Sequence, residues 1–320
     1  MKKLTLILAV VLFSSLFAQE SEILYPIEEN GKWGYINGNG DVVIKPQFGN
    51  AGRFSEGLAH VVKDNKYGYV NPAGRMVIEP RYDYAANFSD GLARVKIGDY
   101  YRYIDKSGNT AISRQFKEAT DFSEGLAAVE VDGKMGYINK QGEMVIPAKF
   151  DAADPFQEGT ASVKVNGRWG FINQKGEYVL EPKYENLMNY TEGLAKVESG
   201  GKYGYIDRTG KVVIKPQYEL TWGFSENLAR VKMANKMGYI DKTGNVVIPL
   251  RYQDAGDFAE GLAPVKVDDK YGYINRSGEL IIQPRFDMAH QFEQGVASVR
   301  VGDTWMYINT EGEVIWEPSQ

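Results

Sequence analysis

The sequence lacks cysteine entirely, which excludes disulfide bonds, thiolate metal sites, cysteine nucleophiles and a lipid-modified N-terminal cysteine. It also lacks clusters of lysine and arginine, because its 37 basic residues are spread among 42 acidic ones for a net charge of −5. A protein that binds a phosphate backbone needs a basic surface, so nucleic acid is not an expected partner. With 43% hydrophobic and 25% charged residues, the composition is that of an ordinary globular protein stabilised by its core.

Long hydrophobic runs are absent except at the start of the chain. Lys2 and Lys3 precede an apolar run over residues 4–11 that extends to Phe17 and is followed by Ala18. This layout is typical of a secretory signal, and the run is too short for a comfortable membrane span. We therefore expect residues 1–18 to be a signal peptide and residues 19–320 to be one exported domain without a membrane span. The sequence does not distinguish between the periplasm, the outer surface and the extracellular space as the location of this domain.

The sequence is rich in repetition. One position, always aromatic or methionine, recurs every 34 residues without an insertion: Trp33, Tyr67, Tyr101, Met135, Trp169, Tyr203, Met237, Tyr271 and Trp305. A fixed period of this length indicates a repeat architecture in which each unit packs on its neighbours. Turn glycines and β-branched residues at period two exclude a helical repeat.

The second unit illustrates the structure predicted for all nine. Residues 58–63 and 66–70 alternate as two antiparallel strands, joined by Asp64-Asn65, a pair that tolerates the positive φ of a type I′ turn. An Asn or Asp followed three positions later by glycine then predicts a three-residue hairpin with a bulge. Strand three covers residues 76–78, and Pro80 is expected to stop it. The turn glycine occurs in every unit: Gly40, Gly74, Gly108, Gly142, Gly176, Gly210, Gly244, Gly278 and Gly312.

These turn lengths fix the register, and the register decides which side chains share a face. Residue 63 is expected opposite 66, residue 61 opposite 68, and residue 59 opposite 70. One face of the sheet carries the aromatic positions Tyr67 and Tyr69, which are either packed between units or exposed for binding. The opposite face is aliphatic and is predicted to be core: Ala59, Val61, Gly68, Val70, Met76 and Ile78.

The linker between units, residues 79–91 in the second unit, repeats at fixed length and is therefore expected to be packed rather than flexible. Its Phe88 is a candidate to fill the space left by the missing side chain of Gly68, as is a closely approaching backbone. An acidic position, Glu56 in the first linker, and a basic position, Lys66 in strand two, could form a ladder of ion pairs between neighbouring units. Each exposed pair would contribute less than about 1 kcal/mol.

A lone three-stranded meander leaves its faces exposed, so neighbouring units must stack. Leu24 and Pro318 stand at the places of Leu58 and Pro46, which makes nine whole meanders and eight linkers. No split unit closes a ring by sharing strands, and this favours an all-β, open superhelical array. Neither end carries the polar cap that an open array needs, and Trp316 adds a further apolar group to the last unit. A closed β-propeller is therefore the alternative.

The hexapeptide at residues 32–37, Lys-Trp-Gly-Tyr-Ile-Asn, followed by Gly40, resembles the WG (or KWG) repeat family of bacterial proteins, as does the segment 167–173. The resemblance covers the chain after the expected signal. It implies a β-rich repeat that is often exported and has no common enzymatic activity. Arg102 and Met306 depart from the motif at its glycine, and Tyr or Met replaces Trp in six of nine units, so no strict role of the tryptophan is implied.

Candidates for acid–base or metal chemistry are few. His60 lies in a first strand and His290 in the last linker, at different positions of the repeat, so the register does not bring them together. The glycines lie in hairpins rather than in a phosphate loop, and no calcium-loop pattern is present. A carboxylate pair for glycoside hydrolysis could lie among the 42 acids, but no insertion builds a site for it. We expect no enzymatic activity, no cofactor and no metal.

The expected function is that of an exported, non-catalytic scaffold that binds protein partners. A carbohydrate or peptidoglycan ligand is the alternative, because flat aromatic rings beside charges suit either, and a cell-envelope hydrolase is the least favoured function. Two departures from the repeat are candidates for specificity: the run 100–103, whose guanidinium can stack, and a linker tryptophan. The candidate ligand-binding residues are Tyr100, Tyr101, Arg102, Tyr103, Trp222, Trp33, Trp169 and Trp305.

Overall fold

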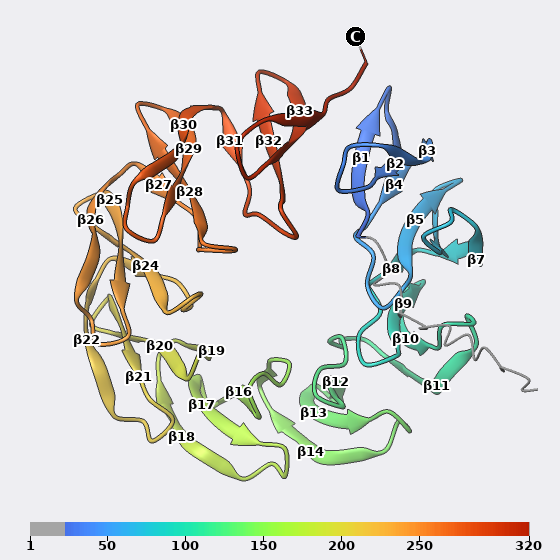
Figure 1. The fold of residues 1–320 in the computed structure, drawn as a ribbon. Coiled ribbons are helices and arrows are strands. Elements are labelled where there is room, and N and C mark those ends of the chain that lie inside the picture. Colours follow the sequence, from blue (N-terminus) through green and yellow to red (C-terminus); the bar gives the residue numbers. More distant parts are fainter. Residues whose placement is uncertain (1–22, 320) are drawn as a thin grey trace, which may run out of the picture.

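The computed structural model describes residues 23–319, and within that range the chain forms strands and turns but no helix. Nine small antiparallel sheets follow one another around a ring (Figure 1), so the fold is a nine-bladed β-propeller. The prediction of nine repeated β-meanders is confirmed. The predicted signal peptide, residues 1–18, lies outside the described residues.

Each unit contains the three predicted strands. Strand one is β1 (Tyr25–Glu29), β5 (Ala59–Lys63), β9 (Ala93–Ile97), β12 (Leu126–Val131), β16 (Thr160–Val165), β20 (Leu194–Ser199), β24 (Leu228–Met233), β28 (Leu262–Val267) and β32 (Val296–Val301). Strand two is β2 (Lys32–Ile36), β6 (Lys66–Val70), β10 (Tyr100–Ile104), β13 (Lys134–Asn139), β17 (Arg168–Asn173), β21 (Lys202–Ile206), β25 (Lys236–Asp241), β29 (Lys270–Asn275) and β33 (Thr304–Asn309). Strand three is β3 (Val42–Phe48), β7 (Met76–Tyr82), β11 (Thr110–Phe116), β14 (Met144–Phe150), β18 (Tyr178–Tyr184), β22 (Val212–Tyr218), β26 (Val246–Tyr252), β30 (Leu280–Phe286) and β34 (Val314–Trp316).

The linkers add short strands of their own. Seven of them pair with strand one of the following unit: β4 (Asn50–Ala51), β8 (Tyr84–Ala85), β15 (Ala152–Ala153), β19 (Leu187–Thr191), β23 (Leu220–Thr221), β27 (Asp254–Ala255) and β31 (Met288–Ala289). In the linker to unit four, a bridge between Ala119 and Val129 takes the place of such a strand. Strand three lies at the outer rim in Figure 1, so these linker strands, at the opposite edge of each sheet, are the inner strands of the ring.

Backbone geometry confirms both predicted turns. Asp64 and Asn65 have φ angles of 52° and 60°, as a type I′ turn requires. Gly74 has a φ of 74°, and its N–H donates to the carbonyl of Asn71 at 2.9 Å. All nine turn glycines have positive φ. The pairing of 59 with 70, 61 with 68 and 63 with 66 is also as predicted.

Strand three is longer than predicted. Pro80 does not end it, because β7 continues to Tyr82 through a bulge. The bulged backbone passes directly against Gly68, where an added Cβ would lie 2.5 Å from the carbonyl oxygen of Ile78. Gly68 therefore leaves room for backbone and not for the ring of Phe88. Proline is tolerated here because strand three is an edge strand and bulges do not need every ladder hydrogen bond.

The core lies between neighbouring units. Tyr69 is fully buried, its ring centroid lies 4.9 Å from that of Phe88 in the following linker, and its hydroxyl donates to the carbonyl of Ala86 at 2.7 Å. This aromatic position is therefore core, as one of the two predicted readings had it. Ile78 joins the same cluster rather than the aliphatic face, because the bulge places it directly opposite Tyr69. The same hydroxyl bond is made by Tyr35, Tyr103, Tyr137, Tyr205, Tyr239 and Tyr273.

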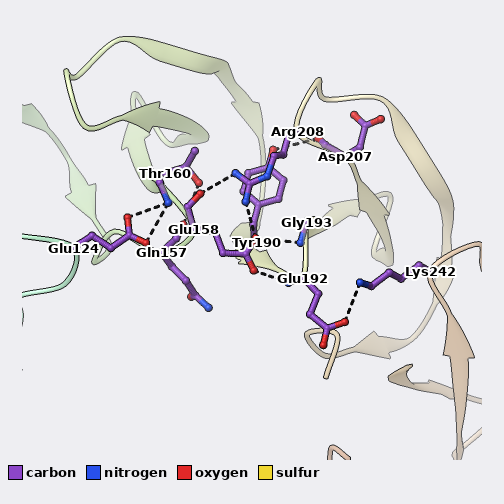
Figure 2. A network of polar contacts seen from close by, with 11 residues as sticks. Glu124, Gln157, Glu158, Thr160, Tyr190, Glu192, Gly193, Asp207, Arg208 and Lys242 are labelled. Carbon is purple, nitrogen blue, oxygen red and sulfur yellow. Dashed lines mark hydrogen bonds and ion pairs between the residues drawn. The ribbon is translucent and has the colours of Figure 1, made fainter. Parts of the chain in front are cut away.

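Unit five makes this contact with the two ring types exchanged. Strand two carries Phe171 and the following linker carries Tyr190, whereas the other units have tyrosine in strand two and phenylalanine in the linker. The two rings lie 4.4 Å apart at 31°. The hydroxyl now comes from Tyr190 and donates to the carbonyl of Asp207 at 3.2 Å (Figure 2). One hydroxyl per interface is thus retained.

The ring closes where unit one meets unit nine, so the closed propeller is found and the favoured open array is not. Tyr25 packs on Tyr307 with ring centroids 5.8 Å apart, and its hydroxyl donates to the carbonyl of Glu293 at 2.8 Å. Arg53 forms an ion pair with the carboxylate of Glu293. Within residues 23–319 no strand is shared. Unit one buries its apolar face here, whereas Tyr307 and Trp316 of unit nine are half-buried and Trp305 is exposed. The buried residues of this junction are Tyr25, Ile27, Ile36 and Val296.

Candidate functional site

An acidic side chain before strand one holds each linker to the next. Glu158 accepts backbone hydrogen bonds from Glu192 at 2.6 Å and from Gly193 at 3.1 Å, and it pairs with Arg208 at 2.6 Å (Figure 2). The guanidinium of Arg208 also lies 4.8 Å from the ring centroid of Tyr190. The same contact to a backbone N–H of the following linker is made by Glu56, Asp90, Glu124, Glu192, Glu226 and Glu260. Successive linkers are therefore tied to one another around the ring.

The basic position at the start of strand two has other partners than predicted. Lys66 pairs with Asp83 at 2.5 Å, and Asp83 also accepts the N–H of Gly98 at 2.8 Å. These hydrogen bonds hold the pKa of Asp83 below its usual value. Among the described residues the predicted ladder does not form, because the Lys66 position pairs with a linker carboxylate, Asp83, and the Glu56 position pairs with a turn lysine, Lys106. Exposed pairs of this kind contribute little stability.

The predicted run 100–103 divides between surface and core. Tyr103 is fully buried and donates its hydroxyl to the carbonyl of Thr120 at 2.6 Å, so it is a core residue. Tyr101 is half-buried, with the guanidinium of Arg94 4.7 Å from its ring centroid. Tyr100 is exposed.

Arg102 occupies the position at which most units have a glycine pressed against the strand-three bulge. In unit two the two residues in contact are Gly68 and Pro80, with an added Cβ on the glycine 2.8 Å from the proline nitrogen. In unit three both members differ, because Arg114 stands where Pro80 is found. Arg102 is half-buried and its Nε is buried without a hydrogen-bond partner, although strand three of unit three keeps the register of unit two. It does not by itself mark a ligand site.

Trp222 and Trp169 lie in two separate junctions of the ring. Trp222 is half-buried beneath the guanidinium of Arg230, 4.2 Å from its ring centroid, and its backbone carbonyl accepts the hydroxyl of Tyr205 at 2.6 Å. Trp169 is half-buried and packs against the cluster that contains Phe171. The structure does not bring these two candidates together.

The remaining candidates, Trp33 and Trp305, both line one cleft at the seam between units one and nine, and Trp33 also packs against the core between units one and two. The cleft has a volume of about 660 Å³, and Trp316 also lines it. Trp305 is 37% exposed. Its counterpart Tyr271 faces Phe286 at the end of a seven-residue strand, whereas β34 ends after three residues, at Trp316. The aromatic wall thus depends on ring closure and on the short last strand.

His290 forms part of this wall. Its ring stacks on Trp305 with centroids 5.0 Å apart and planes 14° apart, and its Nδ1 lies 2.7 Å from the hydroxyl oxygen of Ser298. Burial lowers the pKa of His290, and the nearby Arg53 lowers it further, so the imidazole is neutral at pH 7. His60 has a different partner, the side-chain oxygen of Asn87 at 3.0 Å. The His290 imidazole therefore extends the flat aromatic surface of Trp305.

The charged groups of the cleft are mainly acidic. Glu28, Glu29 and Asp303 line it, and both Glu28 and Asp303 are exposed. Arg53 is the basic group in the lining and is already paired with Glu293, and the guanidinium of Arg300 lies 5.8 Å from the ring centroid of Trp305. Aromatic walls with carboxylates at their edge suit a ligand that is partly apolar and carries a positive charge.

Sequence reasoning named two of the three tryptophans in this cleft and missed Trp316 as part of a site. The available signal was that Trp316 stands eight periods after Ile44, at a position that is aliphatic in every other unit. Within residues 23–319 there is no group of three or more His, Cys, Asp or Glu side chains that could hold a metal ion. No helix in that range is long and apolar enough to cross a membrane.

The fold and this site define the chain as a nine-bladed β-propeller with an aromatic cleft at its seam. The family described as WG containing repeat matches eight successive segments: residues 33–67, 67–101, 101–134, 135–169, 169–203, 203–236, 237–271 and 271–305. The chain therefore belongs to the WG-repeat family. No curated protein matches the sequence.

Among solved structures, a crystal structure of a eukaryotic initiation factor is similar over 92% of this chain and 96% of its own, with 11% identity and a TM-score of 0.66. BamB from Moraxella catarrhalis aligns over 91% of this chain and 89% of its own, with 13% identity and a TM-score of 0.42. At 11% identity, the similarity to the initiation factor shows a shared fold and nothing more.

Proposed function

We propose that the chain is an exported, non-catalytic scaffold that binds protein partners, with the seam cleft as its principal contact site. The observation that supports this most is the convergence of Trp33, Trp305 and Trp316 on one cleft of about 660 Å³, in a chain with only five tryptophans. Tryptophan is enriched among the residues that dominate binding energy at protein interfaces.

The rest of the ring supports the same proposal by its regularity. Linker-to-linker bonds such as that from Gly193 to Glu158, and buried hydroxyl bonds such as that of Tyr69, hold the units in a fixed arrangement. A site on rigid elements binds with little loss of conformational entropy. The seam is the one junction built by residues from both ends of the described chain, so its surface differs from that of the repeated junctions.

A pull-down from cell-envelope extract with chemical crosslinking tests the proposal. Trp305→Ala is the informative variant, and Trp169→Ala, at the same repeat position in unit five, is its matched control. We expect the unmodified chain and the control to capture the same partners and Trp305→Ala to lose them, with each protein assayed below the onset of its own melting transition. Capture that is equal for both variants, or no capture above a chain with a scrambled surface, would contradict the proposal.

Binding of a carbohydrate or peptidoglycan strand is a second candidate, favoured by the exposed indole of Trp305 and its stacked partner His290. A sugar ring stacks on a flat aromatic surface, and carboxylates such as Asp303 accept its hydroxyl hydrogen bonds. Sedimentation with purified cell wall distinguishes this function. It predicts that Trp305→Ala weakens sedimentation, and the variants Trp222→Ala and Arg102→Ala test the other aromatic and guanidinium positions separately.

A further inference from the structure

The inner edge of strand one is occupied in every unit after the first. In unit two, the linker donates backbone hydrogen bonds from Gly49 to the carbonyl of Val62 at 2.7 Å and from Gly52 to that of His60 at 2.9 Å. Asn50 lies opposite Val62 in the same pairing. Through these bonds the linker acts as a short fourth strand.

Unit one makes these contacts differently. Glu28 stands at the place of Val62 and Pro26 at the place of His60. The carbonyl of Pro26 accepts the hydroxyl of Tyr307 at 2.6 Å instead of a linker N–H. The ring of Tyr25 packs on Tyr307, where other units have the linker phenylalanine. Side chains thus replace part of the linker, but within residues 23–319 no strand pairs with the inner edge of β1.

We propose that the inner edge of β1 binds an extended peptide of a partner protein as an added strand. This inference deepens the proposed scaffold function and rests on it. The strand would run along the seam cleft, which Glu28 lines together with Trp33 and Trp305. Main-chain hydrogen bonds to a sheet edge supply affinity, and the flanking pockets supply selectivity.

The register defines the residues that such a peptide needs. By the pairing of Ala51 with Val61, one peptide residue lies opposite Ile27, and at this position the eight linkers have only small or aliphatic residues. They are Ala51, Ala85, Ala119, Ala153, Leu187, Thr221, Ala255 and Ala289. The preceding peptide residue lies opposite Glu28, and a lysine or arginine there would complement the carboxylate. Unit eight has this pair with the signs reversed, because Asp254 lies opposite Lys266.

The chain's own upstream sequence fits this position poorly. One period before Ala51 stands Phe17, where all eight linkers have Ala, Leu or Thr. One period before Phe54 stands Glu20, where the other linkers have an aromatic residue. A partner peptide with a basic residue followed by a small apolar one matches the edge better.

The test uses a linker of this chain as a probe. In unit five, residues 150–159 occupy the equivalent edge: Ala152 lies opposite Lys164, and the N–H of Asp151 donates to the carbonyl of Lys164 at 2.8 Å. A synthetic, fluorescent copy of 150–159 with Ala152→Lys is titrated with the full chain and followed by anisotropy. We expect saturable binding that weakens about tenfold when the Asp151 amide of the probe is N-methylated, as the loss of one hydrogen bond implies.

Three protein variants separate the contributions. Glu28→Pro removes the N–H at the inner edge together with the carboxylate, and it is tolerated there because that edge faces away from β2. It should therefore weaken binding by about tenfold or more without a change in the melting temperature. Glu28→Lys should weaken the binding of the basic probe and strengthen the binding of a probe with Ala152→Glu. Glu181→Lys makes the same charge change at an exposed site in unit five and should have no effect.

The absence of binding overturns the proposal. Binding whose affinity is unchanged by N-methylation of the probe and by Glu28→Pro overturns it as well. An edge already covered by the residues upstream of Ile23 would give no binding and would overturn it equally. These outcomes are distinguishable from failure of the scaffold function. Partners that are captured from envelope extract equally by the unmodified chain and by Glu28→Pro would leave the scaffold in place and remove the added strand.

Discussion

The hydroxyl of Tyr307 donates a hydrogen bond of 2.6 Å to the backbone carbonyl of Pro26, 281 residues earlier in the chain. In the repeated junctions the corresponding tyrosine reaches a linker carbonyl 17 residues away, as Tyr239 does at Gly256. One interaction type therefore serves both the regular junctions and the seam. What differs is that the seam joins the two ends of the described chain without a covalent linker, and we expect it to open most easily.

Removing the seam hydroxyl tests this expectation. Tyr307→Phe leaves the carbonyl of Pro26 without its donor and should lower the free energy of unfolding by about 1 kcal/mol. Hydrogen exchange should accelerate in β1 and β33 but not in β16 and β17, because the seam opens locally. Tyr239→Phe, the same change inside the ring, is the control and should accelerate exchange around unit seven. Equal acceleration in all units would show that the seam does not open independently.

The glycine of strand two should be intolerant of any side chain. Gly68→Ala places a Cβ 2.5 Å from the carbonyl oxygen of Ile78, a backbone atom that can move only with strand three. Overpacking of this kind should cost about 2 kcal/mol. Gly38→Ala is the control, since no atom lies within 4 Å of a Cβ there. Denaturant unfolding measures both, and an equally mild effect of the two changes would mean that the bulge relaxes freely.

The exchanged ring pair of unit five predicts a coupled double mutant. Tyr190→Phe removes the hydroxyl bond to Asp207, and Phe171→Tyr adds a hydroxyl beside a ring only 4.4 Å away, so each change alone should destabilise the protein. Together they restore the arrangement of the other units and should be nearly neutral. The coupling free energy from a double-mutant cycle should be about 1 kcal/mol or more. Additive effects would show that the two rings do not share one hydroxyl site.

The pH dependence of stability should include a contribution from His60. Burial lowers the pKa of its imidazole below the ordinary value of 6.5, and the hydrogen bond with Asn87 opposes this only in part. The unfolded chain then binds more protons than the folded one between the two pKa values. Stability is therefore complete above pH 6.5 and falls as the pH drops through 6.5 toward the folded-state pKa.

His60→Gln keeps a polar group near Asn87 but cannot be protonated. The loss of stability between about pH 8 and pH 5 should be smaller in this variant than in the unmodified chain, as measured by denaturant unfolding at each pH. His290, whose pKa is lowered as well, should account for part of the loss that remains. A steeper loss in the variant would contradict the direction of the shift.

The sequence by itself determined the repeated unit. Pairs such as Asp64-Asn65 and the turn glycine Gly74 act over a few residues, so their φ angles and the strand register follow from local chemistry. The 34-residue period set the number of units for the same reason. The family resemblance rests on these short-range features and is confirmed by the eight matched repeats.

The tertiary structure decided the rest. Local patterns could not show that strand three passes Pro80, because the bulge is stabilised by its approach to Gly68 in the neighbouring strand. Ring closure depends on the angle between units accumulated over nine copies, which no single unit encodes. Trp33 and Trp305, eight periods apart in the chain, share a cleft only because that angle brings the last unit back against the first.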